Sequence, residues 1–187
     1  MSTGTIVIIA VGAIILLWAI VVFNRFKRLK VQIAEAWSGI DVQLKRKVNI
    51  LTNLLDVLKM QMTFENNLLT ELSKARSGLL AQDHEVAMSA NDKLTQLLSS
   101  ITATAEAYPN LGTNQSYLRM MSDIRDCEDK VTYARTRYNM VVSDFNAGIS
   151  VFPSNIIAGL MKCSPEKMFE ISEPPREIAD NLRIGKM

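Results

Sequence analysis

Residues of the types that carry out chemistry are sparse in this chain of 187 residues. The sequence has one histidine, His84, and two cysteines, Cys127 and Cys163. A di-metal carboxylate site in a helical bundle needs a Glu-x-x-His pair on each of two helices, and the residue three positions before His84 is Ala81. A zinc site would have to join Cys127, which we expect in an apolar seam, to Cys163 near the chain end. We therefore expect no metal and no cofactor.

Sequence motifs for other catalytic chemistry are also missing. The chain contains no nucleophile elbow, no phosphate-binding loop and no dinucleotide-binding glycine pattern. An enzyme of this length would need a pocket in its core, built from side chains such as Asp41, Tyr108, Arg135 and Tyr138. Because no spacing in the sequence demands such a pocket, we expect a non-enzymatic protein and keep an enzyme with a pocket in the bundle core as the least favoured alternative.

Charged residues interrupt an apolar pattern in the stretch AEAWSGIDVQLKRK, residues 34–47. Asp41 falls on a core position of a heptad pattern, where a single polar residue usually fixes the register of packed helices, and a poised functional carboxylate is the less favoured alternative. Glu65 interrupts the same pattern, with a salt-bridged, exposed position as its alternative. Lys45, Arg46 and Lys47 are consecutive and so point to three faces of a helix, which favours a solvated surface over an anion site.

An uncharged apolar segment, residues 5–23, lies near the N-terminus. At about 1.5 Å per residue in a helix, its length matches the roughly 30 Å of a bilayer's hydrocarbon. Four cations follow it directly and none precedes it, which is the reverse of a cleavable signal peptide. We therefore predict a transmembrane helix over residues 5–23 that stays in the mature protein, preceded by a short extracytoplasmic N-terminus, residues 1–4.

The cations after the span predict the orientation of the chain. They lie in a basic juxtamembrane segment, residues 24–30, and are Arg25, Lys27, Arg28 and Lys30. Cytoplasmic flanks carry an excess of Lys and Arg, so the C-terminal part is expected in the cytoplasm. At the headgroup level, each of these cations contributes about 1 kcal/mol of attraction to anionic lipid.

Beyond the membrane, apolar residues recur at heptad spacing and predict three long helices. The first is expected to end near Ser77. Its seam consists of Trp37, Leu44, Leu51, Leu58 and Leu72 on one heptad position and Val48, Leu55, Met62 and Leu69 on the other. The second runs from Asp83 to Tyr108, where Pro109 closes it.

The third helix is capped by Thr113 or Asn114, carries Cys127 in its core face and runs to Phe152. Ser154 precedes a short apolar turn, and Ser164 and Pro165 suit the start of another helix. No run alternates in the manner of a strand. The fold predicted for residues 31–162 is therefore an all-α, up-and-down antiparallel bundle of long heptad-patterned helices, followed by a divergent tail, residues 163–187.

Two blocks of the sequence resemble the LemA family of bacterial and archaeal membrane-anchored proteins. The first is AWSGIDVQLKRKVNILTNLLDVLK, residues 36–59, and the second is residues 106–159, with its Ala-Tyr-Pro, Glu-Asp-Lys, Tyr-Asn and Phe-Pro-x-Asn elements. The chain departs from the family at Thr52, where members commonly have proline, and after Met161. The resemblance implies a helical bundle anchored in a bacterial or archaeal cytoplasmic membrane by a single span, and it implies no established reaction, substrate or cofactor.

The expected helix lengths suggest an interface. If residues 5–77 form one rod, the second helix retraces about half of its cytosolic part and the third runs away from the membrane again. An apolar strip on the first helix would then lack a partner in its own chain, and such a strip usually marks an interface. The strip consists of Trp37, Ile40, Leu44, Val48 and Leu51, with Asp41 among them. We therefore expect a membrane-bound homo-oligomer, a scaffold that orders or curves the bilayer.

The alternative is a membrane-tethered adaptor that binds another protein through the bundle or the tail. Apolar residues available in that region are Met168, Phe169, Ile178 and Leu182. Nucleic acid is not an expected partner, because the net charge is only +2 and aromatic residues make up 6% of the chain. Membrane lipid is the one partner expected under either hypothesis.

Overall fold

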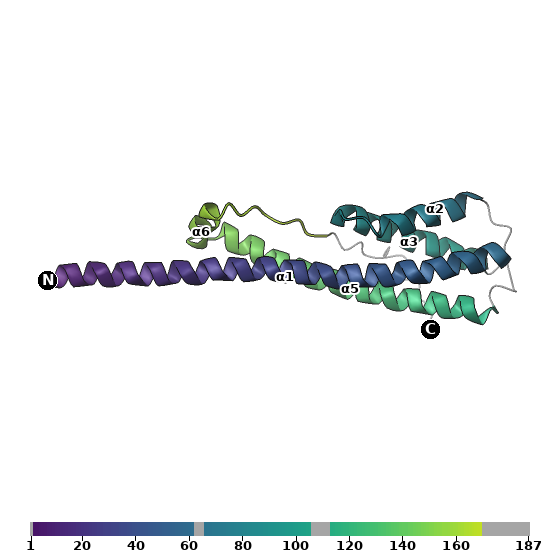
Figure 1. Ribbon diagram of the computed structural model, residues 1–187, viewed down its shortest axis with the longest axis horizontal. Coiled ribbons are helices and arrows are strands. Elements are labelled where there is room, and N and C mark those ends of the chain that lie inside the picture. The colour runs from purple at the N-terminus through teal and green to yellow at the C-terminus, as the bar shows by residue number, and fades with distance from the viewer. Residues whose placement is uncertain (1, 62–65, 106–112, 170–187) are drawn as a thin grey trace, which may run out of the picture. The chain divides into compact units, whose positions relative to one another are not determined.

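A computed structural model describes residues 2–61, 66–105 and 113–169. Within these ranges the chain is all-α, as the sequence predicts. The helices are α1 (Thr3–Gln61), α2 (Asn66–Gly78), α3 (His84–Ala105), α5 (Gln115–Ser150) and α6 (Ser154–Leu160) (Figure 1). Contacts divide the described residues into two units: the first is made of residues 2–41 with 133–168, and the second of the described residues between 42 and 132 together with Phe169. Helices α1 and α5 contribute to both units.

In the first unit, α5 packs antiparallel to α1. The rings of Phe26 and Phe145 meet edge to face with centroids 6.1 Å apart, and those of Trp37 and Tyr138 meet in the same way at 6.3 Å. Because a later residue of α1 meets an earlier residue of α5, the two helices run in opposite directions. Such aromatic pairs contribute about 0.5–1.5 kcal/mol beyond the area they bury. Helix α6 adds Ala158 to the apolar cluster around Phe26.

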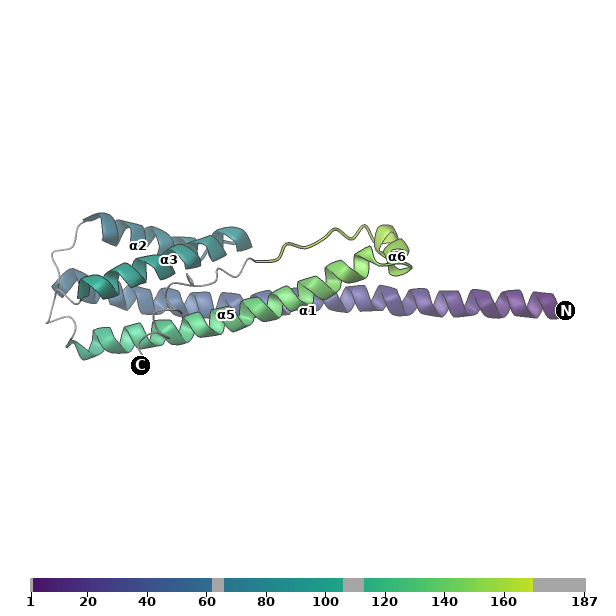
Figure 2. The ribbon, with the colours of Figure 1, turned by 180° about the vertical axis from the view of Figure 1, so that it is seen from behind.

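In the second unit, α2 and α3 lie side by side, as Figures 1 and 2 show, and they pack with α1 and α5 segments around an apolar core. Gly78 of α2 approaches Ala90 of α3 so closely that an added Cβ would lie 2.6 Å from the Ala90 Cβ. The buried apolar side chains of this core include Leu44, Leu51, Leu58, Leu72, Leu94, Ile101, Ile124 and Cys127. The prediction that Cys127 is a core residue is confirmed.

Side-chain caps explain where two helices begin. The Asn114 carboxamide oxygen accepts hydrogen bonds from the backbone N–H groups of Ser116 at 2.9 Å and Tyr117 at 3.1 Å, which satisfies donors that the first turn of α5 leaves open. Asp83 does the same for α3 through the N–H groups of Glu85 at 2.8 Å and Val86 at 3.2 Å. Both caps stand where the sequence places the start of a helix.

The predicted length of the first helix is wrong. Helix α1 ends at Gln61, and a separate helix, α2, begins at Asn66 and packs on α3. The seam residues Leu58 and Leu72 are both fully buried, but they belong to different helices. A heptad register that continues through a break carries no sign of the break, so the pattern alone joined the two. Glu65 and Met62 lie outside the described residues.

The predicted direction of the third helix is also wrong, and this removes the reason for an exposed strip. Helix α5 returns antiparallel along α1 in each unit instead of running away from the membrane. Within the single chain Ile40, Leu44 and Leu51 have no exposed surface and Val48 is buried. Trp37 and Asp41 are half-buried. The chain therefore covers this face of α1 itself.

The last described segment, residues 163–169, forms no helix, so the predicted start at Ser164 and Pro165 is wrong. Polar contacts hold it along α5 instead. Asn146 makes a reciprocal pair with Glu166: its side-chain N–H donates to the Glu166 carbonyl at 2.8 Å and its carbonyl oxygen accepts from the Glu166 backbone N–H at 2.9 Å. The Tyr138 hydroxyl donates to the Lys167 carbonyl at 3.4 Å. These bonds satisfy backbone groups that an extended segment would otherwise leave open.

Candidate functional site

A lysine buried in the second unit is the most unusual polar feature of the described chain. Lys47 lies on α1 between the core positions of Leu44 and Leu51, and its side chain has no exposed surface. Lysine is almost never fully buried unless it is paired. The expectation that residues 45–47 form a solvated surface is therefore wrong for Lys47.

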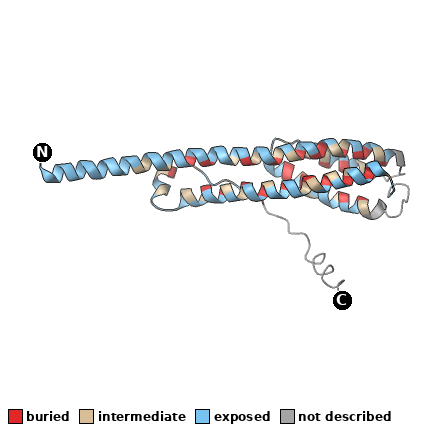
Figure 3. Ribbon diagram, turned by 90° about the horizontal axis from the view of Figure 1, so that it is seen from below, coloured by how far each residue is buried: buried red, intermediate tan, exposed pale blue. Residues whose placement is uncertain are grey.

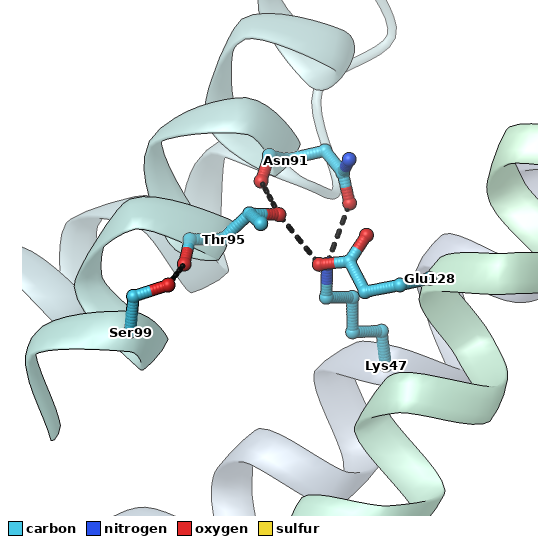
Figure 4. Close-up of polar contacts among 5 residues, drawn as sticks. All are labelled: Lys47, Asn91, Thr95, Ser99 and Glu128. Carbon is cyan, nitrogen blue, oxygen red and sulfur yellow. Dashed lines mark hydrogen bonds and ion pairs between the residues drawn. The ribbon is translucent and has the colours of Figure 1, made fainter. Parts of the chain in front are cut away.

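Two other helices supply the partners of Lys47 (Figure 4). Its ammonium donates to the Asn91 side-chain oxygen on α3 at 2.7 Å and forms an ion pair with Oε1 of Glu128 on α5. The Thr95 hydroxyl donates to the same Glu128 oxygen at 2.5 Å and also lies 3.0 Å from the Asn91 backbone carbonyl. We call Lys47, Asn91, Thr95 and Glu128 the central polar cluster.

Burial decides the proton affinity of Lys47. Loss of hydration lowers the pKa of its ammonium below the ordinary value, and the negative charge of Glu128 and the hydrogen bond to it act in the opposite direction without fully offsetting that loss. Cys127 lies next in sequence to Glu128 and is also affected: burial raises the pKa of its thiol, with Arg46 and Lys47 as weaker opposing influences. The cluster thus holds a cation that is costly to keep charged beside a thiol that is costly to ionise.

The central polar cluster is closed to substrates in this structure. A desolvated lysine is a familiar nucleophile or base, but a reacting molecule has to approach within hydrogen-bond reach of its nitrogen. Protein atoms cover Lys47 completely, and the Glu128 side chain is 23% exposed at the edge of the cluster. The geometry therefore suits a structural role, in which these polar contacts connect α1, α3 and α5. A buried ion pair of this kind can specify the register of packed helices.

A second ion-pair group on the surface joins the same two long helices. Asp126 of α5 accepts from Arg46 of α1 at 3.0 Å and from Lys130 at 2.9 Å. The Lys130 hydrogen bond is the largest of the effects that lower the pKa of the Asp126 carboxyl. All three side chains are nearly half exposed, so solvent screens both ion pairs. This group adds specificity rather than stability.

Three of the four residues considered for an enzymatic pocket lie among the described residues. Tyr108 lies outside the described residues, and Asp41 is half-buried. Arg135 and Tyr138 are both buried on α5, where Tyr138 packs on Trp37 and burial raises the pKa of its phenol. Among the residues that the structure describes, no group of three His, Cys, Asp or Glu side chains is placed to hold a metal ion.

The N-terminal half of α1 has the character of a membrane anchor. It is long and apolar enough to cross a bilayer, and only 6% of its most apolar window is buried within the chain, unlike the core helix of a soluble protein. In Figure 3 this part of α1 is pale blue, the colour of exposed residues. The headgroup candidates Arg25, Lys27, Arg28 and Lys30 are all exposed. Lys30 lies over the Phe145 ring, 5.7 Å from its centroid.

The residues expected to bind partners have different surroundings. Of the proposed interface, Ile40, Leu44, Val48 and Leu51 are covered by the chain itself. In the tail, Met168 is exposed and Phe169 is buried, while Ile178 and Leu182 lie outside the described residues.

Sequence reasoning missed the central polar cluster, although a signal was present. Lys47 follows the seam residue Leu44 by three positions, Asn91 follows Ala87 by four, and Glu128 follows Ile124 by four. Each polar residue thus shares a helix face with a core residue. Three core-facing polar residues on three helices, two of opposite charge, would have indicated a buried pair.

Comparisons with known proteins agree with the fold. The chain is 26% identical over 163 residues to Protein LemA of Metamycoplasma hominis, an alignment that covers 86% of this chain and 74% of that protein. It is 21% identical to the magnetosome proteins MamQ 1 and MamQ 2 of Paramagnetospirillum magneticum, where 73% of this chain aligns with 60% of each relative. The chain thus spans about three fifths of the length of those two. The LemA family model matches residues 36–180, so the chain belongs to the LemA family.

Proposed function

We propose that this protein is a non-enzymatic, membrane-tethered adaptor: the apolar half of α1 holds it in the membrane, and its helical bundle is displayed at the cytoplasmic surface to bind another protein. The observation that carries the proposal is the burial of Ile40, Leu44 and Leu51 inside a single chain. A bundle that completes its own core needs no second copy to cover α1.

One further observation supports a binding role over a catalytic one. The desolvated amine of Lys47 is fully covered and engaged by Asn91 and Glu128, so it is withheld from substrates.

The orientation in this proposal rests on charge. Arg25, Lys27, Arg28 and Lys30 directly follow the span and are exposed, and an excess of cations favours the cytoplasmic side.

The test is to extract the full-length chain from its native membranes in lipid-polymer discs and to determine the mass and protein content of each disc. The adaptor proposal expects one copy of this chain together with a different protein. Several copies of this chain alone would refute it and favour the self-associating scaffold. A chain that lacks residues 170–187 separates the two proposed docking regions: loss of the second protein places binding in the tail, and its retention places binding on the bundle.

A further inference from the structure

The turn between α5 and α6 exposes an unusual concentration of apolar side chains. Four large apolar residues within ten positions are more than half exposed: Val151 at 58%, Phe152 at 74%, Ile156 at 56% and Leu160 at 78%. Residues 145–161 also contain no charged side chain, and Asp144 and Lys162 flank them. We call residues 151–160 the apolar tip.

The apolar tip lies beside the membrane-spanning part of α1. Ile157, Leu160 and Met161 line a groove of about 380 Å³ whose other wall is formed by α1 residues, and those residues are Leu16, Ala19, Ile20 and Phe23. Figures 1 and 2 both show α6 next to α1 in this region. At about 1.5 Å per residue, the step from Phe23 to Leu16 reaches roughly 10 Å into the span. The tip is therefore level with the hydrocarbon layer that the span would occupy.

Close packing on α1 fixes the tip at this level. A Cβ added to Gly148 would lie 3.0 Å from the Phe26 ring, so the end of α5 sits directly against α1. Ala158 of α6 is buried in the same cluster, with Val22 and Ile157 packed against it. Leu160 is 78% exposed on a backbone that this packing holds beside the span.

The backbone of the tip is suited to a medium without water. Irregular structure at membrane depth requires its polar groups to be satisfied internally. The N–H groups of Val151, Asn155 and Ile156 donate to Ala147, Val151 and Pro153 carbonyls at 2.9–3.2 Å. The Ser154 hydroxyl lies 2.7 Å from the Gly148 carbonyl oxygen and 2.8 Å from the Val151 carbonyl oxygen. It is therefore placed to donate a hydrogen bond to carbonyl groups at the carboxyl end of α5. Pro153 has no N–H to leave open.

We propose that the apolar tip, residues 151–160, inserts into the cytoplasmic leaflet beside the span and is a second membrane attachment site of this protein. Its ligand is the upper acyl-chain region of the bilayer. We favour lipid over a protein partner because the tip is continuous with the membrane span. Lys162, exposed directly after α6, reaches the headgroups together with Arg25 and Lys27. The second attachment fixes the rotation of α1 about its own axis, which a single membrane-spanning helix leaves free.

The inference rests on the proposed membrane anchoring, so its test reports on both separately. Three full-length chains, each with one tryptophan, are reconstituted in phosphatidylcholine–phosphatidylglycerol vesicles. The first carries Trp37→Phe and keeps Trp18 in the span. The second carries Trp18→Phe, Trp37→Phe and Leu160→Trp. The third replaces the last change with Met140→Trp, a matched control on an exposed position of α5 that is 65% exposed.

Fluorescence is then quenched from either side, with lipid brominated near the top of the acyl chain or with aqueous iodide. The inference expects brominated lipid to quench Trp18 and the Leu160→Trp chain alike, and iodide to quench the Leu160→Trp chain several-fold less than the Met140→Trp chain. Equal iodide quenching of these two chains would overturn it. Protection of the Leu160→Trp chain from both quenchers would also overturn it, since protein would then cover the tip.

Failure of Trp18 to respond to brominated lipid would instead refute the anchor itself. Circular dichroism verifies that each chain is helical. A Phe152→Trp chain, an aromatic exchange at a position 74% exposed, repeats the measurement at the other end of the tip and must agree with the Leu160→Trp result.

Discussion

Removal of the Glu128 charge tests the assignment of the central polar cluster. In the variant Glu128→Gln, the buried ammonium of Lys47 keeps the Asn91 oxygen and loses its counter-charge. Removal of one partner from a buried ion pair costs about 3–5 kcal/mol. The cost has a natural ceiling, because Lys47 can release its proton: lowering a pKa from its ordinary value near 10.5 to pH 7 corresponds to about 5 kcal/mol at 1.36 kcal/mol per unit.

The assay is urea unfolding of the full-length chain in detergent, followed by circular dichroism. With a slope of about 2 kcal/mol per molar urea, the expected loss lowers the unfolding midpoint by roughly 2 M. Asp129→Asn, on the exposed neighbour of Glu128, is the matched control and is expected to change stability by about 0.5 kcal/mol or less. A Glu128→Gln effect no larger than that of Asp129→Asn would refute the assignment.

Replacement of both charges gives the complementary result. In Lys47→Met with Glu128→Leu, no unpaired charge is left in the core, so stability is expected to lie within about 1–2 kcal/mol of the natural chain although each single change is severe. Additive losses in the double variant would show that the two side chains do not act as a pair.

The pH dependence of stability follows from the lowered pKa of Lys47. Between the folded-state pKa and the ordinary value near 10.5, the unfolded chain binds more protons than the folded chain. The free energy of unfolding therefore rises with pH in this window, and this added stability is lost as the pH drops through the folded-state pKa. Lys47→Met removes that rise, and Lys59→Met, at an exposed position of α1, keeps it. Parallel pH profiles for the natural chain and Lys47→Met would contradict the burial of this amine.

Two further predictions concern packing and thiol reactivity. Gly78→Ala places a methyl group 2.6 Å from the Ala90 Cβ and is expected to destabilise the chain by about 1–3 kcal/mol. Gly39→Ala adds a methyl group that meets nothing within 4 Å and is expected to stabilise α1 by about 0.5–1 kcal/mol. Thermal unfolding followed by circular dichroism compares the two variants. Burial raises the pKa of the Cys127 thiol, so iodoacetamide is expected to modify the half-buried Cys163 first and Cys127 only on unfolding. Mass spectrometry identifies the modified cysteine, and modification of Cys127 before Cys163 would contradict the place of Cys127 in the core.

The sequence predicted what depends on local pattern. The uncharged run of residues 5–23, the helix start at Asp83, the cap at Thr113 or Asn114 and the core position of Cys127 are each determined by neighbours within one or two helical turns. These features follow from helix periodicity and capping chemistry, which a single sequence displays directly.

The features that the sequence did not predict depend on how distant segments meet. The heptad register from Leu58 to Leu72 is the same whether the helix continues or reverses, so the separation of α2 from α1 was hidden. The direction of α5 followed from that error, and with it the expectation that Leu44 lacks a partner in its own chain. The Lys47–Glu128 pair joins residues 81 positions apart, so neither charge alone revealed its burial.

Thiol labelling in intact cell membranes shows whether the chain covers its own α1 face. Leu44→Cys and, as a matched control, Val42→Cys, at a position 57% exposed, are treated with a membrane-permeant maleimide at low and high expression levels, and mass spectrometry reads each position. Rapid labelling at position 42 and protection at position 44 are expected at both levels. Labelling at position 44 that is rapid at low expression and suppressed at high expression would contradict this expectation, because other copies would then cover that face.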